Sequence, residues 1–519
     1  MIQTLNLRVD PKTAATPMLL VAHISNELGI DANRIKDVRI VRRSIDARQR
    51  RVMVNLTVNM ALDTIEPLEI AKPVEYKPLP DNAPACIVVG AGPAGLFASL
   101  RLIELGIKPI LLERGKDVDS RRKDMAQIAR NGTVDPDSNY CFGEGGAGAY
   151  SDGKLYTRSK KRGSIDKILQ IFHQHGAKED VLIDAHPHIG TDKLPEVIKS
   201  IRRTIERCGG EVRFQTKVTG LLMSPEKDKV TGVVTADGTS IYGPVILATG
   251  HSARDIYQML HDHKIVLEPK GIAVGVRLEH PQSLIDQIRY HSPQGRGKYL
   301  PPAEYTMLTR VDDRGVYSFC MCPGGYVVNS SSEKGRLCVN GMSYHDRAGH
   351  NSNTALITTV TPDDFPSDSP LAGLEFQRKY EELAYKIGNG KIPVQLFGDF
   401  LKNQMSTKLG NVTPSIKGEW QFANLHECLP DYVCASLEEG MRAFGHKIKG
   451  YDAEDTVFSG VETRTSSPLR MERNKQFESN IQGLFPCGEG AGYAGGITSA
   501  AMDGIKTAEA IAEKILTQN

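Results

Sequence analysis

The sequence predicts an α/β fold: a central parallel β-sheet with a β-meander, flanked by helices, interrupted by an inserted α+β domain and preceded by a small β-α-β-β N-terminal domain. Three observations predict it. Residues 85–113 read as strand, glycine turn, helix and strand, residues 245–250 add a short buried strand, and residues 483–517 repeat the order strand, glycine loop and helix. Short, continuously apolar strands joined through helices are typical of a parallel sheet that is covered on both faces.

The first glycine turn has the spacing of a dinucleotide-binding turn, with Gly90, Gly92 and Gly95. Gly90 permits the tight turn, Gly92 removes a Cβ where the backbone approaches a pyrophosphate, and Gly95 lets the helix pack close to the strand. The N-terminus of that helix offers free N–H groups and the positive end of its dipole to phosphates. Glu113, which ends the next strand, is suited to accept hydrogen bonds from ribose hydroxyls.

The glycine pattern also occurs at residues 143–148 and 490–495, so the pattern by itself is weak evidence. The first of these copies follows no clear strand, and the second lies too near the C-terminus for a further strand and acid. Only the copy at Gly90 has the complete unit. The sequence therefore predicts a Rossmann-like dinucleotide site there, the alternative being a glycine turn of another α/β fold.

Composition sets wider limits. The 519 residues contain 64 Lys and Arg against 62 Asp and Glu, a net charge of +2 that gives no general argument for nucleic acid or an anionic membrane. No apolar run approaches the roughly 20 residues that span a bilayer, and no signal region follows Met1, so we expect no membrane span and a cytoplasmic protein. Nine cysteines without a Cys-x-x-Cys motif indicate reduced thiols.

Residues 1–66 alternate like a β-α-β-β unit and predict a small α+β domain. Residues 1–60 carry ten Lys or Arg against five Asp or Glu, a local net charge of +5. Five arginines gather where the last two strands join, which predicts a projecting basic hairpin: Arg42, Arg43, Arg48, Arg50 and Arg51. The hairpin is interpreted either as a solvated tip or as a binding patch for RNA, a phosphorylated ligand or an acidic protein partner. Five prolines in residues 67–84 predict an extended linker.

The glycine-rich stretch 141–154 predicts a loop whose backbone lies flat against a planar ring, with Gly145 and Gly146 among its glycines. Ser151, Asp152 and Lys154 would then address the polar edge of that ring. The alternative is a flexible surface loop. His186 and His188 lie two residues apart, but no further His or Cys shares a ligand spacing nearby, so we expect no metal.

The pattern changes after His251 to mixed strands and helices, which predicts an inserted substrate domain over residues 256–455, between nucleotide-binding segments at 85–255 and 456–519. Within it, Cys320 and Cys322 are either a redox couple or alternate strand residues that simply pack. The helix after Thr498 is placed to stabilise negative charge on a reduced ring through its dipole.

Taken together, residues 85–255 and 456–519 resemble the FAD-binding, glutathione-reductase-like flavoproteins. Four stretches are more specific: Phe142-Gly-Glu-Gly-Gly-Ala-Gly, Ser151-Asp-Gly-Lys, Phe319-Cys-Met-Cys-Pro-Gly-Gly and Cys487-Gly-Glu-Gly-Ala-Gly-Tyr-Ala-Gly-Gly-Ile. They are similar to the largely uncharacterised bacterial FAD-dependent dehydrogenase family, and this resemblance spans nearly the whole chain. It implies noncovalent FAD. One departure is Glu489, which stands where the wider superfamily has Asp beside the ribityl chain.

The resemblance, with the motifs above, predicts the residues of the cofactor site: Gly90, Gly92, Pro93, Ala94, Gly95, Glu113, Arg114, Gly145, Gly146, Val218, Ala248, Thr249, Gly250, Gly488, Glu489, Gly495, Gly496 and Ile497. The candidate catalytic residues are Lys154, Cys320, Cys322 and Arg464, where the two cations are interpreted either as contacts of an anionic substrate or reduced flavin, or as structural charges.

The function implied is an FAD-dependent dehydrogenase that exchanges a hydride between flavin N5 and a small-molecule substrate, with NAD(P)H as a transient electron donor. A flavin-dependent hydroxylase or C=C reductase fits the same layout. The remaining alternatives are an RNA-associated flavoprotein, such as a tRNA-modifying enzyme, and a flavin-stabilised scaffold without catalysis.

Overall fold

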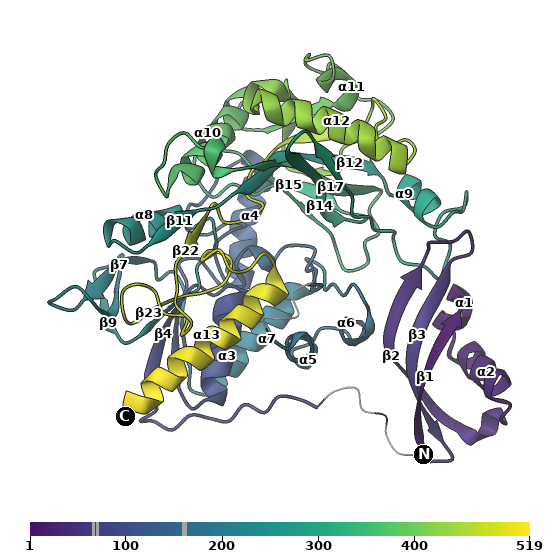
Figure 1. Ribbon diagram of the computed structural model, residues 1–519, viewed down its shortest axis with the longest axis horizontal. Helices are drawn as coiled ribbons and strands as arrows, with labels where there is room; N and C mark the ends of the chain where they lie inside the picture. The colour runs from purple at the N-terminus through teal and green to yellow at the C-terminus, as the bar shows by residue number, and fades with distance from the viewer. Residues whose placement is uncertain (65–67, 69–71, 158–162, 519) are drawn as a thin grey trace.

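The computed structural model describes residues 1–64, 68, 72–157 and 163–518, and its centre is a parallel five-stranded sheet in the order β23-β10-β4-β5-β6 (Figure 1). The strands are β4 (Ala85–Val89), β5 (Lys108–Leu112), β6 (Glu211–Arg213), β10 (Val245–Leu247) and β23 (Leu484–Pro486). Strand β10 pairs in parallel with both β4 and β23, so three distant parts of the chain meet at the middle of the sheet. The predicted α/β class with a central parallel sheet is confirmed.

Helices cover this sheet: α3 (Pro93–Glu104), α4 (Val118–Asn131), α5 (Ile165–Gln174), α7 (Leu194–Arg207) and α13 (Ile497–Gln518). The C-terminal helix α13 lies along α3 (Figure 1). A Cβ added at Gly504 would lie 2.2 Å from the carbonyl oxygen of Ala94, so glycine permits this close approach. Between β6 and β10 the chain forms the predicted antiparallel meander of β7 (Val218–Met223), β8 (Val230–Thr235) and β9 (Ser240–Tyr242).

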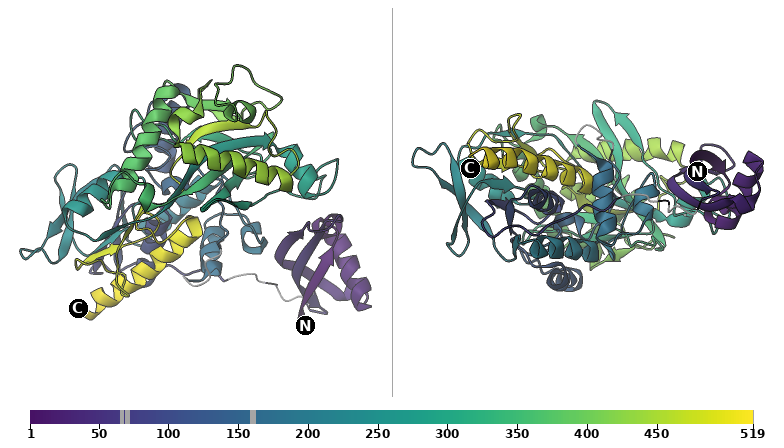
Figure 2. Two further views of the ribbon diagram at one scale, coloured as in Figure 1. Left: turned by 45° about the horizontal axis from the view of Figure 1, so that its top comes forward. Right: turned by 90° about the horizontal axis from the view of Figure 1, so that it is seen from below.

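Above this sheet in Figure 1 lies a second, seven-stranded sheet in the order β13-β14-β17-β12-β21-β18-β20. Its strands are β12 (Ile272–Pro281), β13 (Leu308–Val311), β14 (Arg314–Cys322), β17 (Asn351–Val360), β18 (Ile392–Leu396), β20 (Trp420–Phe422) and β21 (Val457–Glu462). Its pairs are antiparallel except β18 with β20. Two long helices cover its outer side, α10 (Ala372–Ile387) and α12 (Asp431–Lys447) (Figure 2).

The structure moves one expected boundary of this inserted domain. We expected the nucleotide-binding part to resume at residue 456. Strand β21, however, pairs with β12 and β18 inside the seven-stranded sheet, so the inserted domain continues through Glu462. An isolated apolar strand does not reveal which sheet it joins, and this is why the sequence placed it too early.

Shorter elements complete the body. Two short strands, β11 (Leu267–Pro269) and β22 (Leu469–Met471), pair antiparallel between the two large sheets. A three-stranded sheet holds β15 (Tyr326–Asn329), β16 (Val339–Met342) and β19 (Ile416–Lys417). The short helices are α6 (Asp180–Ile183), α8 (Arg254–Asp262), α9 (Gln282–Arg289), α11 (Phe397–Phe400) and the 3₁₀ turns Ala32–Arg34, Gly146–Gly148, Pro362–Asp364 and Leu425–Cys428. In the described part of the chain, no helix has the length and apolar character that crossing a bilayer requires.

The N-terminal unit is an antiparallel sheet in the order β1-β3-β2, at one end of the molecule (Figures 1 and 2). Its elements are β1 (Ile2–Val9), α1 (Pro11–Ala15), α2 (Pro17–Leu28), β2 (Ile35–Asp46) and β3 (Met53–Leu62). Leu20 and Ile24 of α2 pack on the sheet in a core of their own. Of the expected linker, residues 67 and 69–71 lie outside the described residues, and residues 72–84 form neither helix nor strand.

We had expected the β2–β3 hairpin to project from the N-terminal domain, but it contacts the rest of the protein. Arg43 lies on β2, and its guanidinium pairs with Asp184 at 2.6 Å, while its carbonyl accepts the backbone N–H of Ala185. His291 contacts the carbonyl oxygen of Ala47 at 2.8 Å, and Val52 packs into the core of the inserted domain. The hairpin therefore docks on the rest of the protein through Arg43, Ala47 and Val52, whose partners are far away in sequence. Arg48 instead pairs with Asp46 inside the hairpin and stays exposed.

Candidate cofactor and substrate cleft

A cleft of about 420 Å³ lies between the parallel sheet and the inserted domain. One end lies at the glycine turn after β4, and the other lies where the loop 151–156 meets β14. The carboxyl ends of β4 and β10 border it, as expected for a ligand site of an open α/β sheet. A volume of this size is typical of cofactor and small-molecule sites.

The glycine turn at the first end depends on close backbone contacts. Gly90 has a φ of +103°, and a Cβ there would lie 2.7 Å from the carbonyl oxygen of Ala248. A Cβ at Gly95 would lie 1.9 Å from the carbonyl oxygen of Gly90. Gly92 differs: the nearest atom to its added Cβ is 3.9 Å away, and the residue lines the cleft. Gly90 and Gly95 thus permit the fold, while Gly92 leaves room for a ligand.

Gly92 is also the N-cap of α3, and no side chain caps this helix end. The first turn of α3 therefore directs its backbone N–H groups and the positive end of the helix dipole toward the cleft. Pro93 and Ala94, the first two residues of the helix, line the cleft. An anionic group such as a pyrophosphate fits this position.

Glu113 is buried and holds three loops together. Its carboxylate accepts the backbone N–H groups of Ala91 at 2.8 Å, Gly115 at 2.9 Å and Gly143 at 2.9 Å. A carboxylate has about four acceptor positions, so about one remains for a ribose hydroxyl. Next to it, Arg114 lies over the ring of Phe142 and pairs with Asp255 at 2.8 Å.

Residues that follow β10 and β23 form another part of the cleft wall. Thr249, His251 and Glu489 all line the cleft. Burial raises the pKa of Glu489 to about 7, and burial, with help from nearby arginines, lowers the pKa of His251 to about 3. Within the described residues, the buried atoms Thr249 Oγ1 and His251 Nδ1 have no hydrogen-bond partner. Buried polar atoms normally have partners, so these two indicate a ligand in the cleft.

The far end of the cleft is strongly charged. Asp152 lies 2.7 Å from Lys154 Nζ and 2.6 Å from Arg347 Nη2, and it also accepts a hydrogen bond from Ser343. Although burial opposes the ionisation of Asp152, the two cations lower its pKa below the usual range. Burial alone would lower the pKa of Lys154, but Asp152 raises it above its ordinary value. Lys154 is thus a fixed cation at the cleft wall.

Cys320 and Cys322 do not face the same way, in contrast to the strand alternation we considered. Between Phe319 and Cys322 strand β14 spans three residues while β17 spans two, from Ala355 to Asn353. This bulge gives Cys320 a φ of +46°, which is rare for a residue with a side chain. As a result Cys320 lines the cleft, whereas Cys322 is fully buried.

Arg464 borders the cleft but its hydrogen-bonding groups are used by the protein. Its Nε and Nη2 donate to the two oxygens of Glu381 at 2.9 and 2.8 Å, and Nη1 donates to Ser252 and Ser332. The side chain of Glu381 has no exposed surface and also pairs with Arg254. Of the two interpretations we considered, the geometry favours a structural cation.

The structure gathers most of the predicted residues in one cleft. The predicted residues that line it are Gly90, Gly92, Pro93, Ala94, Glu113, Arg114, Gly146, Lys154, Val218, Ala248, Thr249, Gly250, Cys320, Arg464, Glu489, Gly495, Gly496 and Ile497. The four predicted residues that do not line it are Gly95, Gly145, Cys322 and Gly488.

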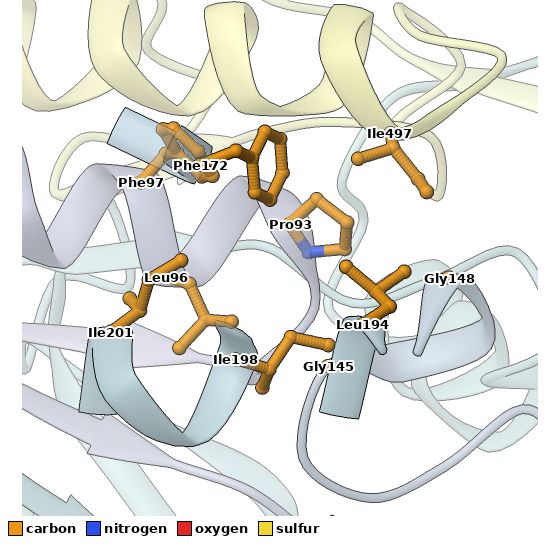
Figure 3. A pocket seen from close by; sticks show the side chains of 10 residues that line it. All are labelled: Pro93, Leu96, Phe97, Gly145, Gly148, Phe172, Leu194, Ile198, Ile201 and Ile497. Carbon is orange, nitrogen blue, oxygen red and sulfur yellow. The ribbon is translucent and has the colours of Figure 1, made fainter. Parts of the chain in front are cut away.

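Gly145 and Gly488 support the walls from behind. Gly145 faces α7, where a Cβ would lie 2.4 Å from Ile198 Cδ1, and both residues border a small apolar cavity of about 10 Å³ behind the cleft (Figure 3). Gly488 packs against α3, with an added Cβ 2.8 Å from the Cβ of Ala94. The contact joins the C-terminal segment to the glycine turn.

Sequence patterns missed other lining residues. Tyr156 and Phe319, both substantially exposed, lie at the charged end, and Asn340 and Glu462 come from the inserted domain. No motif marks Asn340 or Glu462, because strands β16 and β21 bring them in from distant parts of the chain. The local signals for the other two were the stretch Phe319-Cys-Met-Cys-Pro-Gly-Gly, which begins at Phe319, and the stretch Ser151-Asp-Gly-Lys, which ends two residues before Tyr156.

These features fit FAD. A glycine turn with open space at Gly92, a helix N-terminus, two buried polar atoms without partners and an elongated cleft are what an adenine dinucleotide with a planar ring requires. The adenosine end would lie near Glu113 and Val218, and the ring end near Lys154 and Ile497. Among the described residues, no group of three or more His, Cys, Asp or Glu side chains is arranged to hold a metal.

Comparison with known proteins agrees with this assignment. Residues 83–241 match a family described as FAD binding domain, and residues 271–465 match one described as FAD-dependent protein, C-terminal domain-like. Residues 1–61 match a domain of unknown function. An uncharacterized protein of Clostridium beijerinckii is 44% identical over 99% of this chain and 98% of its own length.

Solved structures match this chain with lower similarity. The flavin-dependent brominase Bmp2 is 13% identical, covers 84% of this chain and 80% of its own, and has a TM-score of 0.37. A geranylgeranyl bacteriochlorophyll reductase-like protein of Thermoplasma acidophilum is 12% identical over 84% of this chain and 80% of its own, with a TM-score of 0.35. The identity over the full length to the clostridial protein, together with the two FAD-related matches, places this chain in the family of that clostridial protein, as an FAD-binding flavoprotein oxidoreductase.

Proposed function

We propose that the protein is an FAD-dependent dehydrogenase that removes a hydride from a small-molecule substrate or from transiently bound NAD(P)H. The observation that carries this proposal is the cleft itself, which runs from the glycine turn to a charged end where the loop 151–156 meets residues of the inserted domain. FAD, when bound, supplies the hydride acceptor. The polypeptide then has to hold the cofactor, orient the substrate and keep bulk water out.

We propose that the two large sheets have different roles. The parallel sheet and its glycine turns hold the cofactor, and the inserted domain contributes Cys320, Asn340 and Glu462 to the substrate end. Tyr156 and Phe319 are partly exposed there, with 50% and 40% of their surfaces accessible, and both line the cleft. We propose that a substrate enters between these aromatic rings.

The charges at this end favour a substrate with an anionic group. Lys154 Nζ lines the cleft, and its pairing with Asp152 at 2.7 Å fixes its position without removing its remaining hydrogen-bond donors. Lys154 would orient the anionic group of the substrate. Asp152, whose low pKa keeps it ionised, would hold that cation in place.

NAD(P)H is proposed as a transient donor for a structural reason. In the described residues, the inserted domain is built on a mainly antiparallel sheet, and the complete glycine turn between parallel strands occurs at Gly90. A second nucleotide domain of the same type is therefore not part of the described chain. A nicotinamide donor would have to enter through the cleft mouth and leave again.

The test is an anaerobic titration of the purified, FAD-loaded protein with NADH and, separately, NADPH, followed by the visible absorption of the flavin. Bleaching by either nucleotide identifies the donor. If neither bleaches the flavin, the substrate itself must be the donor, and a panel of small anionic hydroxy, amino and saturated acids is screened in the same way. Oxygen consumption coupled to substrate hydroxylation would replace the dehydrogenase proposal with a hydroxylase.

The Lys154→Met variant sharpens the test. We expect it to keep its FAD content and to lose most of its affinity for an anionic substrate, seen as a raised KM. Lys116→Met is the matched control, because Lys116 also pairs with an aspartate, Asp124 at 2.7 Å, but does not line the cleft. Equal KM values for the two variants would remove Lys154 from the substrate site.

A further inference from the structure

The two cysteines of the inserted domain meet at a distorted point of a strand. The bulge in β14 gives Cys320 a left-handed backbone conformation that is unfavourable for a residue with a Cβ. The Cys322 thiol lies 3.4 Å from the carbonyl oxygen of Cys320. The bulge thus directs one sulfur into the cleft and keeps the other directly behind it, and both are free thiols.

Two cations lie beside this pair. Lys154 Nζ and Arg277 Nη1 are each 3.9 Å from Cys322 Sγ, and Arg277 Nη1 also donates to the carbonyl oxygen of Cys320 at 3.2 Å. Their counter-charges are Asp152, which pairs with Lys154, and Glu462, which pairs with Arg277 at 2.7 Å. Both cations are therefore held in place next to the Cys322 sulfur by ion pairs with carboxylates.

The hydrogen bonds and charges around the pair favour a thiolate on Cys320. A hydrogen bond from the Cys322 thiol and the charges of Lys154 and Arg277 lower the pKa of Cys320, although burial opposes them, and the pKa of Cys322 is raised. The thiolate is therefore favoured on Cys320 rather than on Cys322. Cysteine reactivity follows the thiolate and its access, and Cys320 has both, because it lines the cleft.

We propose that Cys320 and Cys322 form a thiol–disulfide exchange site at the substrate end of the cleft, and that its substrates are small disulfides. The Cys320 thiolate attacks one sulfur of the disulfide, which forms a mixed disulfide and releases the other half as a thiolate. Cys322 then loses its proton and attacks Cys320 Sγ, which releases the second half as a thiol and leaves a Cys320–Cys322 disulfide. Two protein thiols are oxidised and one substrate disulfide is reduced to two thiols.

The inference goes beyond the proposed function, because a disulfide accepts electrons whereas the proposed dehydrogenase substrate gives up a hydride, although both use the same cleft. It does not require turnover of the flavin for its test. Whether the flavin bleaches with NAD(P)H and whether this thiol pair exchanges with a disulfide are separate measurements. Bleaching without exchange overturns this inference alone, and exchange without bleaching overturns the nicotinamide donor alone.

The experiment uses the FAD-loaded full-length protein with reduced thiols and glutathione disulfide as the probe. After acid quenching, free thiols are alkylated, and the peptides are mapped by mass spectrometry. We expect wild type to lose two hydrogens on the peptide that contains both cysteines, which then resists alkylation. Cys322→Ser should stop at the first step, with one glutathionyl group on Cys320. Cys320→Ser should give neither product.

Cys208→Ser is the control, because Cys208 is a buried free thiol that does not line the cleft, and this variant should behave like wild type. Cys141 is the other cysteine that lines the cleft. The inference is overturned if wild type forms no Cys320–Cys322 disulfide, or if Cys141 takes up glutathione in preference to Cys320. The wild-type result decides the matter even if a serine variant fails to fold.

A separate measurement tests the role of Lys154. The rate of alkylation of Cys320 is measured against pH in wild type and in Lys154→Met, with FAD content as the check on folding. Loss of the ammonium should shift the midpoint of this profile to higher pH and slow the reaction near neutrality at least several-fold. An unchanged profile would show that Lys154 does not position the thiolate.

Discussion

The carboxylate of Glu113 accepts the backbone N–H of Ala91 at 2.8 Å, and so joins the end of β5 to the glycine turn after β4. Its other oxygen accepts the N–H groups of Gly115 and Gly143. One buried side chain thus holds the turn, the end of the next strand and the glycine-rich loop in register. Glu113 supports the shape of the cofactor site in addition to any contact with a ribose.

Replacing Glu113 with Gln should therefore lower both stability and FAD content. The amide can keep an oxygen toward Gly115 and Gly143 only by pointing its NH₂ group at the N–H of Ala91, and a buried donor without an acceptor costs about 1–3 kcal/mol. Thermal unfolding of the apo-protein and flavin content after purification are the measurements. Glu226→Gln, at an exposed position, is the control. If the variant has normal thermal stability and binds FAD weakly, Glu113 contacts the ribose but does not support the fold.

The sequence predicted the parallel sheet because its signals are local. A buried strand, a glycine turn and a helix N-terminus follow one another within residues 85–95, and each feature supports the same structure. The position of β21 was not predictable in this way. Its hydrogen-bond partners β12 and β18 are about 65 to 185 residues earlier in the chain, and its residues alone do not distinguish one sheet from another.

Arg464→Met should lower the free energy of unfolding of the protein rather than weaken the binding of a substrate. The substitution leaves Glu381, which is fully buried, with Arg254 as its remaining cation. Removing one partner from a buried ion pair costs about 3–5 kcal/mol, and the second arginine should keep the loss toward the lower end. Thermal unfolding measures it, with Arg310→Met as the control at an exposed position. A normal melting temperature together with a raised KM would restore Arg464 as a substrate contact.

Glu489 should make the apo-protein less stable as pH rises. Burial raises its folded-state pKa from 4.5 to about 7, so between these values the folded state keeps a proton that the unfolded state has lost. Stability then falls as pH increases through this window. Glu489→Gln removes the effect and should gain stability relative to wild type, on the order of 2 kcal/mol across the window, since part of the side chain faces the cleft. Parallel denaturation curves over pH measure the difference, and a constant difference would contradict the assignment.

The candidate site was predictable where glycine or charge marks it and not where strands converge on it. Gly92 and Glu489 were found from motifs, whereas Asn340 and Glu462 reach the cleft only through the packing of the inserted domain. Cys320 and Cys322 were found as a pair, but a regular strand would have aligned them. The bulge that separates their roles depends on pairing with β17, about 30 residues further along the chain.

Substitution of the three glycines of the turn should separate cofactor binding from folding. Gly95→Ala brings a Cβ to within 1.9 Å of a backbone oxygen, and Gly90→Ala combines a 2.7 Å contact with a positive φ, so both variants should be poorly folded even without FAD. Gly92→Ala meets nothing closer than 3.9 Å, and its φ of −76° suits alanine. Its apo-protein should therefore unfold within about 0.5 kcal/mol of wild type.

Gly92→Ala should nevertheless bind FAD at least about tenfold more weakly, because the new methyl group occupies the space where the pyrophosphate approaches the backbone, and a loss of about 1.4 kcal/mol already gives that factor. Reconstitution of the apo-protein with FAD, followed by flavin fluorescence, measures the affinity. Gly220→Ala is the control, since its added Cβ meets only Val234 at 3.7 Å, away from the cleft. If Gly92→Ala binds FAD as tightly as Gly220→Ala does, the pyrophosphate does not lie at this turn, and the orientation of the cofactor in the cleft has to be reversed.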